Sequence, residues 1–190
     1  DYIILGAGSA GCVLANRLSL DPSNKVLLLE AGGTDRRFFI QMPIGYGKTY
    51  HQKAVNWMYM TEPSPEADNK PSYWPRGKVL GGSSSINGMI FQRGNPADYE
   101  RWAVTPGCKE WSYSHCLPYF QKMETCLHGA DRYRGDSGPL MLERGPASSP
   151  LFGAFFNAVQ EAGYDLTEDV NGYRQEGFAS FDRNIYQFQY

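Results

Sequence analysis

The first thirty residues show two apolar runs that flank a segment with helical spacing. The runs are Tyr2–Leu5 and Val26–Leu29, and between them Val13, Leu14, Ala15 and Leu18 fall on one side of a helix over residues 9–20. Short apolar runs bounded by glycine or by a turn predict buried strands, and apolar residues three and four apart predict the buried face of a helix. A breaker sequence, Asp-Pro-Ser-Asn at residues 21–24, turns the chain between helix and second strand. The chain is therefore predicted to begin as an α/β fold.

The helical period returns near the end of the chain. Between residues 150 and 162, apolar residues recur every third or fourth position, with Ser149 placed to cap the helix and Gly163 to end it. We expect the aromatic residues of this helix to belong to the core.

A less regular pattern predicts another helix over residues 111–124. Ser112 or Ser114 is the expected cap, and Pro118 is expected early in the helix, where proline is tolerated.

Three glycines follow the first predicted strand in the spacing Gly6-x-Gly8-x-x-Gly11, and Glu30 follows the second. This order and spacing is the fingerprint of an adenine dinucleotide site. Gly6 permits a tight turn, Gly8 lets the backbone approach a pyrophosphate, and Gly11 allows close packing of the helix. The acid would accept hydrogen bonds from the ribose hydroxyls, and its charge disfavours the extra phosphate of NADP.

The stretch after this motif helps to choose between NAD and FAD. Residues 34–75 have no regular period and are rich in proline, glycine and aromatic residues. Simple nicotinamide dehydrogenases would instead continue with strand and helix units. An irregular excursion suits packing over an extended cofactor and favours FAD.

A second glycine cluster carries an independent signal. Gly81 and Gly82 are followed by Ser83 and two further serines, and then by Asn87. Such a loop exposes backbone N–H groups and hydroxyls that suit phosphate oxygens or the polar edge of a flavin. Arg76 and Lys78 add positive charge just before it. A flexible linker is the alternative interpretation, although apolar residues flank the loop on both sides.

Composition narrows the class of protein. The net charge of −2 and the absence of any basic run longer than two residues argue against nucleic acid as a partner. No stretch approaches the length of a membrane span. The four cysteines form no C-x-x-C pair and have no metal-type spacing with the three histidines, so we expect free thiols and no metal site. The chain opens at Asp1, already at a strand, so a processed leader would leave no trace.

Read together, the motifs resemble the glucose-methanol-choline (GMC) oxidoreductases, which are FAD-dependent alcohol oxidases and dehydrogenases. The resemblance runs over about residues 1–185. It is carried by Gly6-Ala7-Gly8-Ser9-Ala10-Gly11, Glu30-Ala31-Gly32-Gly33, Arg76-Gly77-Lys78-Val79-Leu80-Gly81-Gly82-Ser83-Ser84-Ser85-Ile86-Asn87-Gly88, Arg93-Gly94-Asn95, Gly135-Asp136-Ser137-Gly138-Pro139-Leu140 and Gln175-Glu176-Gly177-Phe178.

The resemblance implies a Rossmann-like FAD-binding domain over residues 1–145, with 34–75 as a lid-like excursion, followed by the start of a substrate-binding domain at 146–190. It implies that the adenosine diphosphate half of FAD lies along the first motif and the rest of FAD along the second. The implied cofactor-binding residues are Gly6, Ala7, Gly8, Ser9, Ala10, Gly11, Glu30, Ala31, Arg76, Val79, Gly81, Gly82, Ser83, Asn87, Gly88 and Met89. Some members attach FAD through a histidine at the position of Ile86. Isoleucine cannot form that bond, so non-covalent FAD is expected.

Within the family, the sequence is most similar to the choline-oxidising members. This implies choline as the alcohol substrate and a quinone or another electron acceptor, with membrane association in the full protein. The location would be the mitochondrial inner membrane, or the bacterial cytoplasm or membrane. Other alcohols, with oxygen as acceptor, and a catalytically inactive FAD-binding fragment remain alternatives. Trp57, Tyr59 and Tyr73 are candidate aromatic contacts for a quaternary ammonium group, with core or lid packing as the alternative.

The family's catalytic histidine lies far downstream, in a chain well over twice this length. His51, His115 and His128 do not match its motifs. No catalytic residue is therefore expected within these residues, and the chain alone is expected to be inactive.

Overall fold

A computed structural model of the chain describes residues 1–185. The described residues form two compact units, the first over Asp1–Gly88 and the second from Met89 onward. This division falls earlier than residue 145, where the resemblance places the end of the FAD-binding domain. Compactness within this chain does not test the domain boundary of a longer protein, so that boundary stays a prediction.

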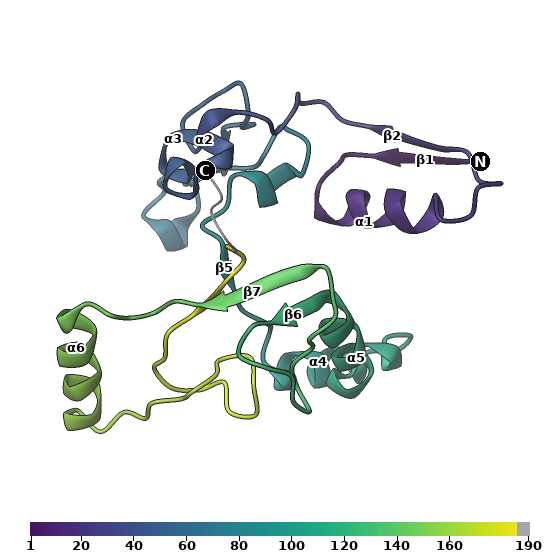
Figure 1. Ribbon diagram of the computed structural model, residues 1–190. Coiled ribbons are helices and arrows are strands. Elements are labelled where there is room, and N and C mark those ends of the chain that lie inside the picture. The colour runs from purple at the N-terminus through teal and green to yellow at the C-terminus, as the bar shows by residue number, and fades with distance from the viewer. Residues whose placement is uncertain (186–190) are drawn as a thin grey trace. The chain divides into compact units, whose positions relative to one another are not determined.

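The first unit begins with the predicted strand, helix and strand (Figure 1). Strand β1 (Tyr2–Leu5) pairs in parallel with β2 (Val26–Leu29), with Tyr2 opposite Val26, and helix α1 (Ser9–Leu18) connects them. The helix ends two residues earlier than predicted, at a Ser19 whose N–H donates to the carbonyl of Ala15. The α/β prediction is confirmed at this end of the chain.

The predicted buried face of α1 is largely wrong. Val13 and Leu14 are 56% and 51% exposed, while Gly11 is the buried residue of the helix. A two-stranded sheet is too narrow to cover a full helix face. Periodicity identified the apolar side of the helix, but it could not show what covers that side.

Residues 34–75 contain only short elements, as the irregular pattern predicts. They are α2 (Phe38–Gln41), the 3₁₀ turn η1 (Pro43–Gly45), α3 (Tyr46–Thr49), β3 (Tyr59–Met60), the 3₁₀ turn η2 (Pro65–Ala67) and β4 (Tyr73–Trp74), with β3 and β4 antiparallel. A further 3₁₀ turn, η3 (Gly82–Ser85), lies in the second glycine cluster.

A small apolar cluster holds this excursion against the rest of the first unit. Val55, Val79 and Ile86 are almost fully buried in it, and Ile40 and Tyr50 pack against them. Backbone pairing brings the same segments together. The N–H of Leu80 donates to Gly33, just beyond β2, and the N–H of Lys78 donates to Val55.

Over residues 89–185, the second unit combines a mixed sheet with three helices. Its strands lie in the order β5 (Ile90–Phe91), β8 (Asp182–Arg183), β7 (Leu140–Arg144) and β6 (Glu124–Cys126); β6 and β7 are parallel and the other pairs antiparallel. The helices are α4 (Pro96–Ala103), α5 (Tyr113–Met123) and α6 (Pro150–Glu161), and the 3₁₀ turn η4 (Lys109–Trp111) precedes α5.

Both predicted helices of this unit are present, with differences at their ends. Ser149 caps α6 by accepting from the N–H of Leu151, and Gly163 follows the helix with φ +81°. Ser112 holds the N-cap position of α5, but its hydroxyl contacts Ser114 and His115 instead of capping. Pro118 lies inside α5 and not early in it, where the helix therefore lacks one backbone donor.

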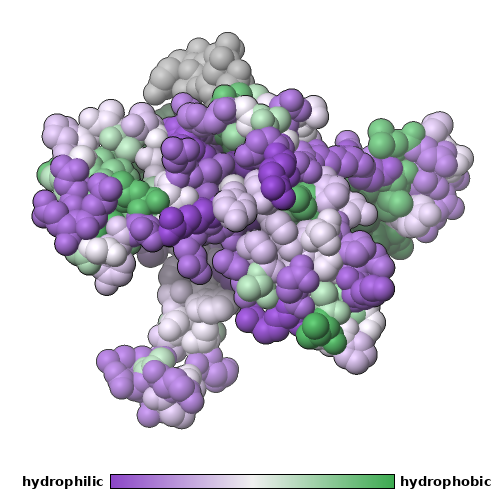
Figure 2. Space-filling model, turned by 90° about the horizontal axis from the view of Figure 1, so that it is seen from below, coloured by the Kyte–Doolittle hydropathy of each residue, from purple (hydrophilic) through white to green (hydrophobic). Residues whose placement is uncertain are grey.

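The aromatic residues of α6 do not form a core within this chain. Phe152 and Phe155 are 47% and 51% exposed, and Val159 is the buried residue of the helix. Hydrophobic side chains at the surface are visible in green in Figure 2. Helical spacing located the apolar face, but within residues 89–185 this face is only partly covered, with Phe178 in contact with Phe155.

Six charged side chains from distant segments form a largely buried network at the sheet of the second unit. Arg93 lies 3.0 Å from Glu124, and Arg134 contacts Glu124, Asp169 and Asp182. Arg144 completes the set by contacting Asp169 and Asp182. Three guanidinium groups face three carboxylates, so the network is formally neutral. Buried charges are tolerated only when they are paired in this way.

Candidate dinucleotide-binding site

The structure brings the two glycine motifs into direct contact. The N–H of Gly81 donates to the carbonyl of Ala7 at 2.7 Å. A Cβ added to Gly82, whose φ is +59°, would lie 2.8 Å from the Cα of Gly8. Glycine at position 82 therefore allows the two loops to come this close. Two signals that are far apart in the sequence therefore belong to one site.

Glu30 fastens the turn between β1 and α1. One carboxylate oxygen accepts the N–H of Ala7 at 2.8 Å, and the other accepts the N–H of Gly32 at 2.8 Å. Each carboxylate oxygen has a second acceptor position. The side chain can therefore hold the glycine turn and still accept a hydroxyl from a ribose.

A cavity of about 710 Å³ lies where these elements meet. It is lined by Leu5, Gly6, Gly8, Leu29, Glu30, Ala31, Trp57, Tyr59, Arg76, Gly77, Gly82 and Ser83. Seven of these were among the predicted cofactor-binding residues: Gly6, Gly8, Glu30, Ala31, Arg76, Gly82 and Ser83. A Cβ on Gly8 would meet no atom within 4 Å, so the backbone of this loop is open to the cavity.

The start of α1 makes this cavity suitable for an anion. Gly8 is the N-cap, and the backbone N–H groups of the first helical turn have no partner within the helix. The partial positive charge of a helix N-terminus attracts phosphate oxygens. Arg76, which lines the cavity, adds a full positive charge.

The remaining predicted residues lie around the cavity rather than on its lining. Ala7 and Val79 are fully buried. A Cβ on Gly11 would lie 2.0 Å from the carbonyl oxygen of Gly6, so Gly11 serves the close packing that the motif predicts. Ser9 and Ala10 form the first turn of α1, and Gly81 supports the lining through its bond to Ala7.

Three predicted residues come after the second glycine loop. Asn87 and Gly88 follow η3 at the end of the first unit, and Met89 begins the second unit with φ +62°. Their role in cofactor binding stays a prediction.

The serine hydroxyls of the second loop mainly stabilise the loop itself. Ser84 donates to the carbonyl of Gly81 at 2.6 Å, and Ser85 donates to that of Leu80 at 2.7 Å. Ser83 accepts the N–H of Gly77 at 3.1 Å. Since Ser83 accepts here, its own proton remains available to a ligand in the cavity.

Sequence reasoning did not assign Trp57 and Tyr59 to this cavity. They were candidates for an ammonium site or for packing, and the structure places both rings on the lining. Their spacing of two residues gave no reliable signal, because Met58 between them has φ +57° and the segment is not a regular strand. Tyr73, the third candidate, instead has its hydroxyl 3.0 Å from the buried amide nitrogen of Asn56.

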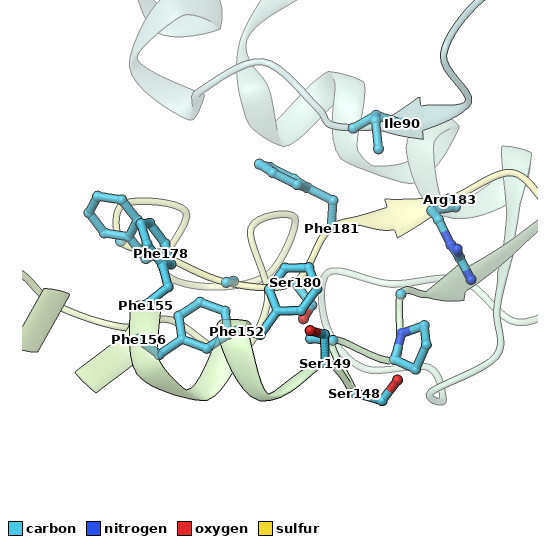
Figure 3. Close-up of a pocket in the computed structure, with 15 residues that line it drawn as sticks. Ile90, Ser148, Ser149, Phe152, Phe155, Phe156, Phe178, Ser180, Phe181 and Arg183 are labelled. Carbon is cyan, nitrogen blue, oxygen red and sulfur yellow. The ribbon is translucent and has the colours of Figure 1, made fainter. Parts of the chain in front are cut away.

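A second cavity, of about 770 Å³, is larger but unsuited to a dinucleotide. Figure 3 shows the rings of Phe152, Phe155 and Phe156 on α6 together with Phe178 and Phe181. The lining is dominated by these aromatic faces, and Arg183 is its charged residue. A diphosphate requires several convergent donors, so the smaller cavity in the first unit is the better candidate site.

None of the three histidines lines the dinucleotide cavity in residues 1–185. His115 lies 3.5 Å from Glu110, and His51 stacks on Tyr73 with ring centroids 5.9 Å apart. Both contacts are structural.

The parallel strands, the glycine turn, the acid after β2 and the open helix N-terminus define a dinucleotide-binding protein of the Rossmann type. The chain belongs to the GMC oxidoreductase family, whose family profile matches residues 1–187.

Known proteins are similar to this chain in sequence and in structure. An oxygen-dependent choline dehydrogenase from Staphylococcus xylosus is 55% identical over 98% of this chain, and the match covers 34% of that protein. The solved structure of pyridoxine 4-oxidase from Mesorbium loti has a TM-score of 0.90 at 34% identity, covering 98% of this chain and 36% of that one. Formate oxidase from Aspergillus oryzae, studied for FAD modification, has a TM-score of 0.86 at 28% identity, over 98% and 34% of the two chains. The chain thus spans about a third of the length of these proteins.

Proposed function

We propose that this chain is the FAD-binding N-terminal part of a flavin-dependent alcohol dehydrogenase that oxidises choline to betaine aldehyde. The contact between the two glycine loops carries this proposal. It places Glu30, the N-terminus of α1 and Arg76 around one cavity, which offers acceptors for a ribose and donors for a pyrophosphate.

The residues present fit FAD. Gly8 and Gly6 leave open space where any side chain would project, so a pyrophosphate could approach the backbone. Glu30 retains acceptor capacity for a ribose, and Ser83 retains a hydroxyl proton. When bound, FAD would accept the hydride that leaves the alcohol carbon. The residues of this chain would bind and orient the dinucleotide.

The remaining catalytic function is proposed to lie outside this chain. Alcohol oxidation requires a base for the hydroxyl proton, and the three histidines here are placed elsewhere. We therefore expect the isolated chain to bind FAD without turnover. The alternative of a catalytically inactive FAD-binding fragment therefore applies to the chain when it is expressed alone.

Non-covalent attachment of FAD is part of the proposal. Ile86, at the position where some relatives have the linking histidine, is 2% exposed in the apolar cluster with Val55 and Val79. Its side chain has no reactive atom, and it is needed for packing.

The substrate and the acceptor are proposed from the choline dehydrogenase relative. Its name supports choline as the alcohol and oxygen, rather than a quinone, as the acceptor. A different alcohol is the second enzymatic candidate, because the pyridoxine and formate oxidases share the fold. Since that relative is bacterial, it gives no support for a mitochondrial location, and we propose the bacterial cytoplasm or membrane. Within residues 1–185, no helix is long and apolar enough to cross a bilayer.

The test uses the full-length protein that carries this chain. We expect it to purify with the visible absorption of a flavin, released as FAD, and to consume oxygen when choline is added. A protein that neither contains nor takes up FAD would overturn the proposal. Bound FAD with oxidation of another alcohol, but not of choline, would overturn only the choice of substrate.

A further inference from the structure

The rings of Trp57 and Tyr59 line the dinucleotide cavity, and neither residue belongs to the two glycine motifs. The ring centroids of Trp57 and Tyr59 are 5.9 Å apart and their planes differ by 4°. The residues are 41% and 50% exposed although they lie within a compact unit. A parallel pair of half-exposed rings can be extended by a third planar ring.

The backbone that carries these rings is held in place by a buried amide. Asn56 is 2% exposed, and its side-chain oxygen accepts the N–H of Met58 at 2.9 Å and that of Arg76 at 3.0 Å. The N–H of Trp57 donates to the carbonyl of Arg76 at 2.9 Å. The ammonium of Lys78 lies 4.7 Å from the centre of the Trp57 ring, a cation–π contact that orients the ring. The pair is therefore positioned without any ligand.

The polar groups of the cavity determine how a dinucleotide would lie in it. The ribose of the adenosine half would lie near Glu30, and the pyrophosphate would lie near the N-terminus of α1 and Gly82. The adenine is joined to that ribose, so it lies at the Glu30 end of the cavity, whose lining there includes Leu29 and Ala31.

We infer that Trp57 and Tyr59 form a stacking surface for the adenine ring of FAD. The inference rests on the proposed function and adds two cofactor-binding residues to it. Stacking of a base on an aromatic side chain needs only two flat faces. It would contribute affinity for the adenine, whereas the glycine loops contribute affinity for the phosphates.

The test measures binding of FAD, ADP and FMN to the full-length apoprotein. In Trp57→Leu and Tyr59→Leu, affinity for FAD and ADP should fall about 10- to 100-fold, as expected for loss of base stacking. Affinity for FMN, which has no adenine, should be unchanged. Trp57→Phe, which keeps a ring, should restore most of the affinity.

Trp102→Leu is the matched control. Trp102 is 51% exposed and also contacts another ring, with its centroid 5.5 Å from that of Tyr99, but it belongs to the second unit and is not part of the cavity lining. Its removal should leave all three affinities unchanged. Tryptophan fluorescence gives a second measurement that can be made on variants of low stability. ADP should quench this fluorescence in the unmodified protein and in Trp102→Phe, but much less in Trp57→Phe.

The outcomes separate the inference from the proposed function. An unmodified protein that fails to bind FAD overturns the proposed function. An unmodified protein that binds FAD, with ADP affinity unchanged in both leucine variants, overturns only the inference. A loss of affinity for FAD and FMN, with ADP affinity unchanged, would mean that the rings stack on the flavin, which also overturns the adenine assignment.

Discussion

Replacement of Gly82 by alanine should separate the two glycine loops. Gly82 has φ +59°, which costs an alanine about 1–2 kcal/mol of backbone strain. The new Cβ would also lie 2.8 Å from the Cα of Gly8, so the loops must move apart by about 0.6 Å to reach ordinary contact at 3.4 Å. Overpacking of this kind costs about 1–3 kcal/mol.

The overpacking in Gly82→Ala should weaken the binding of FAD. FAD can bind only when the two loops are at their native separation. In the alanine variant, this separation restores the clash, so part of the binding free energy is lost in overcoming it. An energy of about 1–3 kcal/mol corresponds to affinity about 5- to 140-fold weaker. Titration of the full-length apoprotein with FAD, followed by flavin fluorescence, measures this loss, and thermal unfolding of the same sample reports the change in stability.

Gly107→Ala is the control that separates the effect of backbone strain from the effect of the steric clash. Gly107 has φ +83°, but a Cβ there would meet no atom within 4 Å. This variant should lose a similar amount of stability through backbone strain and bind FAD normally. If Gly82→Ala and Gly107→Ala bind FAD equally well, contact between the two loops does not determine the site, and the reasoning fails.

Three further predictions follow from other parts of the structure. Asp182→Asn should destabilise the protein by about 3–5 kcal/mol in urea unfolding, because it leaves the three guanidinium groups of the network facing only two carboxylates, those of Glu124 and Asp169. Asp98→Asn, in an exposed pair with Arg101, should cost less than about 1 kcal/mol. Burial alone would raise the pKa of Asp182, but hydrogen bonds from Arg144 and Arg134 outweigh burial and lower it. The stability that Asp182 contributes should therefore be present above about pH 4 and be lost as pH falls through the lowered pKa. The melting temperature of Asp182→Asn should then depend less on pH in this range than that of the unmodified protein. An equal or steeper dependence would contradict this. Acid precipitation should release FAD into the supernatant, since Ile86 cannot bind it covalently, and a yellow pellet would contradict this expectation.

Local patterns were sufficient for the elements and for the family. The apolar runs of β1 and β2 and the spacing of α1 depend on periods that neighbouring residues alone establish. Gly6, Gly8 and Gly11 have steric roles within one turn, and Gly11 fulfils its predicted packing role. These features could be predicted because each is determined within about thirty residues.

Patterns along the chain could not show what covers an apolar face. Val13 and Leu14 on α1, and Phe152 and Phe155 on α6, have the spacing of core residues but are exposed. Hydrophobic periodicity identifies the side of a helix that prefers burial. Whether that side is buried depends on elements that pack against it.

Several features therefore emerged only from the tertiary structure. Gly81 donates a hydrogen bond to Ala7, Trp57 and Glu30 line the same cavity, and Arg134 lies among three carboxylates from separate segments. Each is a contact between residues far apart in the sequence, and such contacts form only when the chain folds. The sequence by itself determined which groups a dinucleotide site would need, while the packing of distant segments decided which of them share one cavity.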